Sequence, residues 1–147
     1  MFKVALADDK SVWRRIAARG SQTLDDLHEA IYEAFDRYDE HLYSFYFPQP
    51  GTRGRARLRT AVEYSHPYTL EEGDFLGESA LNAAETKLSA LGLKPRQVFL
   101  YLFDFGDEWW HEITVEQTDA RPEKGKYPRV LETHAASPPQ YPDMDEE

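Results

Sequence analysis

The sequence predicts an α+β fold in which a mixed, mostly antiparallel sheet packs against one main helix. Three observations support this prediction: one segment has helical periodicity, several short segments have strand-like apolar patterns, and turn residues separate them. The 147 residues suffice for one domain with its own core, and 41% of them are hydrophobic. We therefore predict a single domain over residues 1–142, followed by an acidic tail at residues 143–147.

The main helix is predicted at about residues 24–37. Thr23 is a suitable N-cap, and Asp26 stands three residues later, as in a capping box. Apolar residues then recur at every third or fourth position, which is typical of one buried helix face. They are Leu24, Leu27, Ile31, Ala34, Phe35 and Tyr38. His28 falls on or beside this face.

The strands are predicted from alternating or continuously apolar segments. They cover residues 2–7, 12–16, 42–47, 55–64, 98–103 and 109–117. The segment 98–103 is apolar on both faces, which is typical of a central strand, and residues 105–107 supply a turn into the strand that follows. A short helix is predicted at 85–91, residues 65–78 are mostly turn-like, and the chain after Thr118 is proline-rich and irregular.

Composition and charge exclude several classes of protein. Because cysteine is absent, the chain forms neither disulfides nor a thiolate site, and a metal site would need His, Asp and Glu. The first apolar segment is too short for a signal peptide and no other reaches membrane length, so we expect a cytoplasmic protein without membrane contact. The formal net charge of −10 disfavours wholesale binding to nucleic acid.

One basic segment departs from this acidic composition. Arg53, Arg55, Arg57 and Arg59 occupy alternate positions, so a strand over them would present all four on one face. Such a face could contact the phosphates of a nucleic acid. The alternative, which we favour, is a solvated edge that balances nearby carboxylates and discourages edge-to-edge pairing.

The turn and strand after the predicted central strand carry the main candidates for chemistry. Asp104, Asp107 and His111 could converge with His41 in an acid–base site, and His28, His41 and His111 could hold a divalent metal ion. The structural alternative is that both aspartates accept hydrogen bonds from turn amides and that His111 is a hydrogen-bonded core residue. We favour the structural alternative and predict no cofactor.

Two adjacent tryptophans point to an interaction surface. Trp109 and Trp110 stand in one predicted strand, so both cannot face the core. Trp110 is therefore predicted in a groove or at an interface, where it could support a protein partner or self-association.

Several motifs along the chain together resemble one protein family. They are Trp13-Arg-Arg15, Leu27-His-Glu-Ala-Ile31, His41-Leu42, Tyr101-Leu-Phe-Asp-Phe-Gly-Asp-Glu-Trp-Trp-His111, Glu116, Tyr127-Pro128 and Pro138-Pro139. This set is similar to the plasmid pRiA4b ORF-three-like family, also met as TnpR-type passenger proteins of insertion elements. The resemblance covers nearly the whole chain and implies an α+β fold, but it supplies no reaction. Val130 and Ser137 stand where the fuller pattern often has cysteines.

Two functional classes follow from these observations. The first is a non-enzymatic binding or interaction module linked to mobile elements or regulation, which predicts an exposed aromatic patch. The second is a small metal-assisted or acid–base hydrolase, which predicts that Asp104, Asp107, His111 and His41 meet at a pocket. Weak nucleic-acid binding through the arginine segment is a further alternative.

Overall fold

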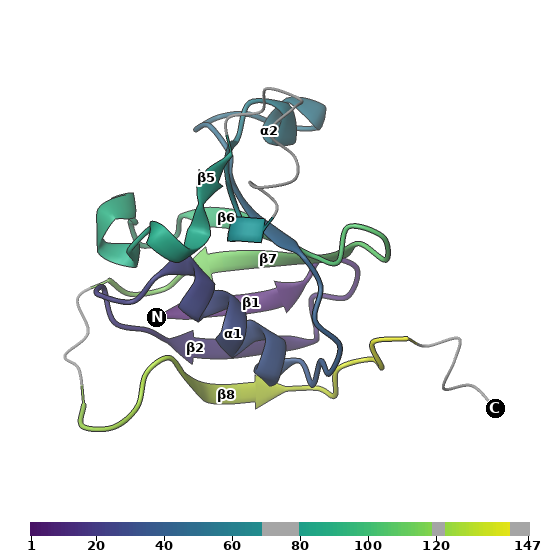
Figure 1. Cartoon of the computed structure of the whole chain (residues 1–147), viewed down its shortest axis with the longest axis vertical. Coiled ribbons are helices and arrows are strands. Elements are labelled where there is room, and N and C mark those ends of the chain that lie inside the picture. Colours follow the sequence, from purple (N-terminus) through teal and green to yellow (C-terminus); the bar gives the residue numbers. More distant parts are fainter. Residues whose placement is uncertain (69–79, 119–122, 142–147) are drawn as a thin grey trace.

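A computed structural model describes residues 1–68, 80–118 and 123–141, and in them eight strands form one open sheet (Figure 1). In spatial order the strands are β5, Leu81–Asn82; β4, Val62–Ser65; β3, Tyr43–Phe47; β6, Val98–Phe103; β7, Trp109–Val115; β1, Phe2–Leu6; β2, Trp13–Ala17; and β8, Arg129–His134. Neighbouring strands are antiparallel except for β4 and β5, which are parallel. The predicted tail at 143–147 lies outside the described residues.

The sheet dominates the fold, and this corrects the picture of a sheet packed against one main helix. Helix α1, Leu24–Ala34, crosses one face of the sheet (Figure 1). Its 11 residues give a length of about 16 Å, whereas eight strands spaced about 4.8 Å apart span about 34 Å. The helix therefore covers only part of the sheet. No helix in the described ranges is long and apolar enough to cross a membrane.

The predicted capping box at the start of α1 is confirmed. The Thr23 hydroxyl accepts a hydrogen bond from the Asp26 amide at 3.2 Å, and the Asp26 carboxylate accepts one from the Thr23 amide at 2.9 Å. Two of the amides that a helix N-terminus leaves without partners are thereby satisfied.

Thr23→Ala is expected to lower the free energy of unfolding by about 1 kcal/mol, because the Asp26 amide loses its acceptor. Urea unfolding followed by circular dichroism measures the difference. Ser89→Ala removes an exposed hydroxyl outside the helix and is the control. Equal stability of the two variants would show that the cap contributes nothing.

Helix α1 ends three residues earlier than predicted. Asp36 adopts a left-handed conformation with φ of 56°, and its amide donates to the Glu33 carbonyl. The Arg37 amide donates to the Tyr32 carbonyl at 3.0 Å. These two bonds form a Schellman motif in which aspartate occupies the position usually held by glycine. The motif turns Arg37 back toward the core.

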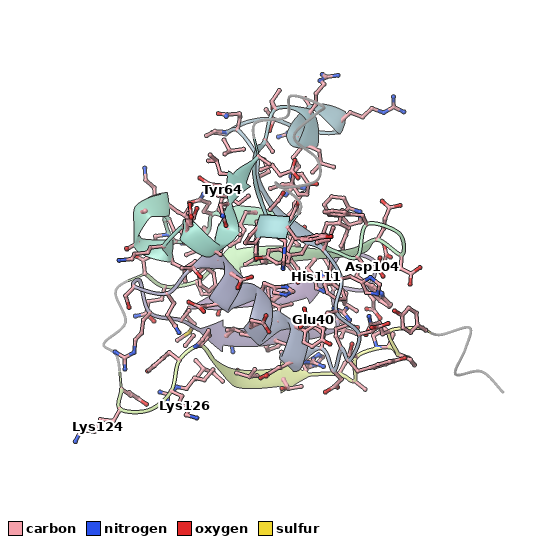
Figure 2. All side chains as sticks on the ribbon, viewed as in Figure 1. Glu40, Tyr64, Asp104, His111, Lys124 and Lys126 are labelled. Atoms are coloured by element: carbon pink, nitrogen blue, oxygen red, sulfur yellow. The ribbon has the colours of Figure 1, made fainter. Side chains whose placement is uncertain are left out.

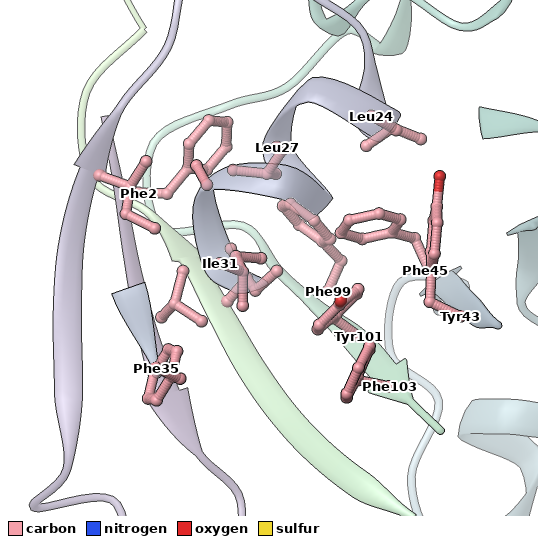
Figure 3. Close-up of a cluster of buried hydrophobic side chains, with 14 of the residues drawn as sticks. Phe2, Leu24, Leu27, Ile31, Phe35, Tyr43, Phe45, Phe99, Tyr101 and Phe103 are labelled. Carbon is pink, nitrogen blue, oxygen red and sulfur yellow. The ribbon is translucent and has the colours of Figure 1, made fainter. Parts of the chain in front are cut away.

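The hydrophobic core lies between α1 and the central strands. Leu24, Leu27 and Ile31 of α1 are completely buried, as is Phe35 at its C-cap. Figure 3 shows the three α1 side chains facing aromatic side chains of β3 and β6, namely Tyr43, Phe45, Phe99, Tyr101 and Phe103, whereas the Phe35 ring contacts His111 of β7. The bounds predicted for β6 are confirmed, and the strand is central, with β3 on one side and β7 on the other.

The strand predicted at 55–64 is wrong over its first half. Residues Arg55–Arg59 form the short helix α2, and β4 begins only at Val62. Alanine, leucine and arginine are strong helix formers, and this local preference prevails over the alternating pattern. On a helix, Arg55 and Arg59 share one side and Arg57 points elsewhere, so the single basic face does not form.

Two further segments differ from the prediction. Strand β8 lies in the region expected to be irregular, where it pairs with β2 at the edge of the sheet. The short helix expected at 85–91 consists of two 3-10 turns, Ala83–Glu85 and Leu88–Leu91, and the second ends at Gly92 in the left-handed conformation. Most of the segment expected to be turn-like at 65–78 lies outside the described residues.

Candidate functional site

The β6–β7 turn places Asp104 beside His41. Asp104 adopts a left-handed conformation with φ of 66°, and its Oδ1 accepts hydrogen bonds from the amides of Gly106 at 3.0 Å and Asp107 at 3.3 Å. Its Oδ2 lies 3.4 Å from His41 Nε2 (Figure 2 labels Asp104). The Asp107 side chain is exposed. Asp104 therefore closes the turn with one oxygen and faces an imidazole with the other.

His41 belongs to a polar network on the surface. Its Nε2 lies 2.8 Å from the Tyr141 hydroxyl oxygen, and this hydroxyl donates to Asp39 Oδ2 at 2.7 Å. The hydrogen bond to Asp39 raises the pKa of Tyr141 to about 12, so the phenol stays neutral. The His41 side chain is one-third exposed and lies between the carboxylates of Asp39 and Asp104.

His111 does not join His41 and Asp104. Its side chain is completely buried, Nδ1 lies 3.3 Å from the Tyr101 carbonyl oxygen, and Nε2 lies 3.3 Å from Arg37 Nη2. Because Arg37 can only donate, Nε2 accepts and Nδ1 carries the proton. Burial and, to a smaller extent, the charge of Arg37 together lower the pKa of His111 to about 3. The imidazole is therefore neutral and points into the core (Figure 2).

Arg37 is a buried cation inside an aromatic cage. It is 6% exposed, and its guanidinium carbon lies 5.5, 5.4 and 4.8 Å from the ring centres of Phe35, Phe103 and Trp109. Within the described part of the chain, Arg37 Nε, Arg37 Nη1 and Trp109 Nε1 are buried and make no hydrogen bond. Burial lowers the pKa of Arg37 to about 10. Cation–π contacts offset only part of the cost of desolvating such a charge.

His28 is buried beneath Tyr43, separate from the other two histidines. The two rings stack with centres 3.9 Å apart, and His28 Nδ1 lies 2.6 Å from the Tyr101 hydroxyl oxygen. Burial lowers the pKa of His28 to about 3, and His66 adds to the effect. Among the described residues, the predicted metal set of His28, His41 and His111 is not a group whose ligand atoms lie close together.

The structure also gives the positions of the arginine segment and of Trp110, the two other surfaces predicted from the sequence. Arg55, Arg57 and Arg59 are spread around α2, and Arg53 is exposed before it, so nucleic-acid binding through these residues stays a prediction. Trp110 is half-buried on the sheet face opposite His111, with its ring centre 5.6 Å from that of Tyr46. Its role in an interface likewise stays a prediction.

Sequence reasoning missed a pocket at the end of β2 and the start of β8. The pocket has a volume of about 380 Å³, and its lining includes Arg19, Ser21, Thr118, Tyr127 and Arg129. Both guanidinium groups lie over the Tyr127 ring, at 4.4 Å for Arg19 and 4.5 Å for Arg129. One wall is therefore an aromatic ring that contacts two cations.

Hydrogen bonds fix this wall. Arg129 Nη2 donates to the Tyr127 hydroxyl at 2.9 Å and to Glu123 Oε2 at 3.0 Å, while Arg19 Nη2 donates to the Glu123 carbonyl at 3.1 Å. The Tyr127 carbonyl accepts from the Gln22 side chain. Arg129 Nε is buried and has no partner among the described residues. Residues from opposite ends of the sequence meet here, which explains why local patterns did not reveal the pocket.

Comparison with known proteins identifies the family. Residues 1–143 match the family described as "Plasmid pRiA4b ORF-3-like protein". The chain belongs to this family. It is similar to the uncharacterised protein y4hQ of Sinorhizobium fredii, with 30% identity over 131 residues, or 88% of this chain and 58% of that protein. It thus spans somewhat more than half the length of this curated relative.

A solved crystal structure has a similar fold. The crystal structure of MM3350, a protein of unknown function from Methanosarcina mazei Go1, matches with a TM-score of 0.72 and 27% sequence identity. The match covers 95% of this chain and 70% of that one. The match to MM3350 supports the fold of this pRiA4b ORF-3-like chain, and neither description names an activity.

The Trp-Arg-Arg motif of this pRiA4b ORF-3-like chain has two different structural roles. Arg14 is 2% exposed; its Nε donates to the carbonyl of Ala34, the last residue of α1, at 2.8 Å. Its Nη1 donates to the carbonyls of Trp13, His134 and Ala135 at 2.9, 3.1 and 3.0 Å. Arg15 instead lies on the opposite face of β2. Arg14 therefore joins α1, β2 and β8.

Proposed function

We propose that this protein is a non-enzymatic binding module, and that the pocket formed by Arg19, Tyr127 and Arg129 binds a small anionic ligand with a carboxylate or phosphate group. The observation that carries the proposal is the contact of two guanidinium groups with one pocket wall. Guanidinium groups match the geometry of carboxylate and phosphate oxygens, because they offer paired N–H donors in one plane.

The distribution of charge supports an anionic ligand. The whole chain has a formal net charge of −10, yet the described lining of the pocket carries Arg19 and Arg129 against one carboxylate, that of Glu123. Figure 2 shows Lys124 and Lys126 projecting from the turn before β8, next to this region. A local positive patch attracts anions even when the protein as a whole is acidic.

The size and the donors of the pocket also suit a small ligand. A volume of about 380 Å³ lies within the usual range of ligand pockets, roughly 300–1,000 Å³. Arg129 Nε is a buried donor without a partner among the described residues, so an incoming oxygen that reaches it satisfies an N–H that otherwise lowers stability. Tyr127 adds an apolar ring against which a ligand can pack.

The chemistry of the lining favours binding over catalysis. The described lining residues include no histidine, the group that most often activates a nucleophile near neutral pH. Of the four residues of the alternative hydrolase, His41 and Asp104 are in contact, whereas His111 is buried against Arg37 and Asp107 is exposed. His111 therefore does not join His41 and Asp104, and the hydrolase stays an alternative prediction.

Calorimetric titration with inorganic phosphate, citrate, adenosine monophosphate and an acidic peptide tests the proposal. At least one of these probes is expected to bind the native protein, and Arg19→Gln is expected to weaken that binding by about tenfold or more, because a charge-assisted hydrogen bond is lost. Arg53→Gln removes an exposed arginine outside the pocket and is the matched control.

Three outcomes contradict the proposal. They are absence of binding for all four probes, equal binding to native protein and Arg19→Gln, and an equal loss in Arg53→Gln. The last outcome would indicate a response to total charge and not to the pocket.

The family description supports a wider role for the module. It names a plasmid reading frame, and we extend the proposal to a regulatory function linked to mobile elements in the cytoplasm. Gene order tests this extension: relatives encoded beside transposition or plasmid-maintenance genes support it, and relatives confined to conserved metabolic operons contradict it.

A further inference from the structure

We propose that Asp25, His28 and Glu29 of helix α1 form a binding site for a divalent transition-metal ion, with Zn²⁺ as the preferred ion. The three residues each offer one ligand atom, and these atoms all lie within 4.8 Å of one another. The site is independent of the anion pocket at Arg19 and differs from the histidine set predicted from the sequence.

Helix geometry brings the three ligands together. Asp25 precedes His28 by three residues and Glu29 by four, and residues at these spacings lie on one side of a helix. His28 Nε2 lies 3.8 Å from Glu29 Oε1. Ligand atoms about 2.0–2.2 Å from a zinc ion are about 3.3–3.6 Å apart, so a metal requires only small rotations of the half-buried Asp25 and the exposed Glu29.

An unsatisfied imidazole nitrogen is the second, independent observation. The His28 side chain is 1% exposed, and its Nε2 is buried and makes no hydrogen bond to any residue that the structure describes. When Nδ1 carries the proton, it donates to the Tyr101 hydroxyl oxygen 2.6 Å away, and the Nε2 lone pair then faces the carboxylates. A buried lone pair directed at negative charge is unfavourable without a cation between them, and ligation by zinc removes the conflict.

The surrounding charges also favour a cation. Glu29 lies among several carboxylates of α1 and of the segment after it, and their negative charges act on it. Those carboxylates are Glu40, Asp25, Glu33 and Asp26, of which Figure 2 labels Glu40. A divalent ion at this point is attracted by several negative groups at once.

Tyr43 orients one ligand. Its hydroxyl donates to Asp25 Oδ1 at 2.5 Å, and its ring stacks on His28. A hydrogen bond from a neighbouring group to a ligating carboxylate is the usual way in which proteins hold a metal ligand in place. The mixed set of one imidazole and two carboxylates is of the kind that zinc accepts.

Zinc titration of chelator-treated protein tests the site. Calorimetry is expected to show one zinc ion bound per chain, and Glu29→Gln is expected to weaken binding by about tenfold or more. Glu33→Gln removes a neighbouring exposed carboxylate that is outside the ligand set, and it is expected to change the affinity by less than about twofold. Both residues are exposed, so neither substitution threatens folding.

A second measurement separates ligation from general attraction. Cobalt is expected to give a visible absorption band in native protein and in Glu33→Gln, and a changed or absent band in Glu29→Gln and in His28→Gln. The proposal is overturned if the Glu29→Gln variant binds zinc with the same affinity as the native protein. It is equally overturned by several weak sites that respond alike to Glu29→Gln and Glu33→Gln.

Discussion

Replacing Arg14 with leucine is expected to lower the free energy of unfolding by about 3–5 kcal/mol. The side chain is buried, and its guanidinium donates to four backbone carbonyls, including that of Ala34 at the end of α1. Leucine leaves these carbonyls in the protein interior without donors, and each unsatisfied group costs about 1–3 kcal/mol. The positive charge also lies at the negative end of the helix dipole, and this attraction is lost.

Arg15→Leu is the matched control, because it removes the same charge from the neighbouring residue on the other face of β2. Arg15 forms half-exposed ion pairs with Glu116 and Glu132, and such surface pairs contribute about 0–1 kcal/mol. Urea unfolding of the three proteins gives the comparison. An Arg14→Leu variant as stable as Arg15→Leu would mean that the carbonyls find other partners and that Arg14 does not hold α1 to β8.

Acidification from pH 6.5 to 5 is expected to reduce the free energy of unfolding by about 3 kcal/mol through His28 and His111. Each has a pKa of about 3 when folded and about 6.5 when unfolded. Below pH 6.5 the unfolded chain therefore binds protons that the folded chain does not. Stability falls by about 1.4 kcal/mol per pH unit for each histidine until the pH approaches 3.

Urea unfolding at several pH values between 7 and 5 measures this loss in chelator-treated protein. This pH range lies above the pKa values of most carboxylates, so their titration contributes little to the measured loss. His28→Gln is expected to remove about half of the loss, because one proton-binding group of the unfolded state is gone. His134→Gln substitutes an exposed histidine and is the control. A stability that stays constant down to pH 5 would show that the two buried histidines are protonated without cost.

The parts of the fold predicted correctly are those whose pattern is local. The capping box at Thr23 and the doubly apolar strand β6 are determined by neighbouring residues, so their positions follow from short windows of sequence. Strand β8 depends instead on β2, more than a hundred residues earlier in the chain, and most of its side chains are exposed. Its own residues therefore show no alternating pattern.

The candidate sites show the same limit more strongly. His41 and Asp104 were proposed together from the sequence, and the structure brings them into contact, but it places Arg37 and not a carboxylate beside His111. Asp25 and Glu29 look like ordinary acidic residues in the first turns of a helix. What distinguishes them is the neighbouring His28 Nε2, which is buried without a partner in the described part of the chain, and burial of one atom depends on the tertiary structure.

The position of β1 in the sheet has a consequence for folding during synthesis. β1 pairs on one side with β2, which follows it closely, and on the other side with β7, which is synthesised much later. Both edges of the early β1–β2 hairpin therefore stay unpaired until their partner strands, β7 and β8, have left the ribosome. Such long-range pairings slow folding and expose strand edges to other chains, so this interval is when chaperone contact would protect the protein most.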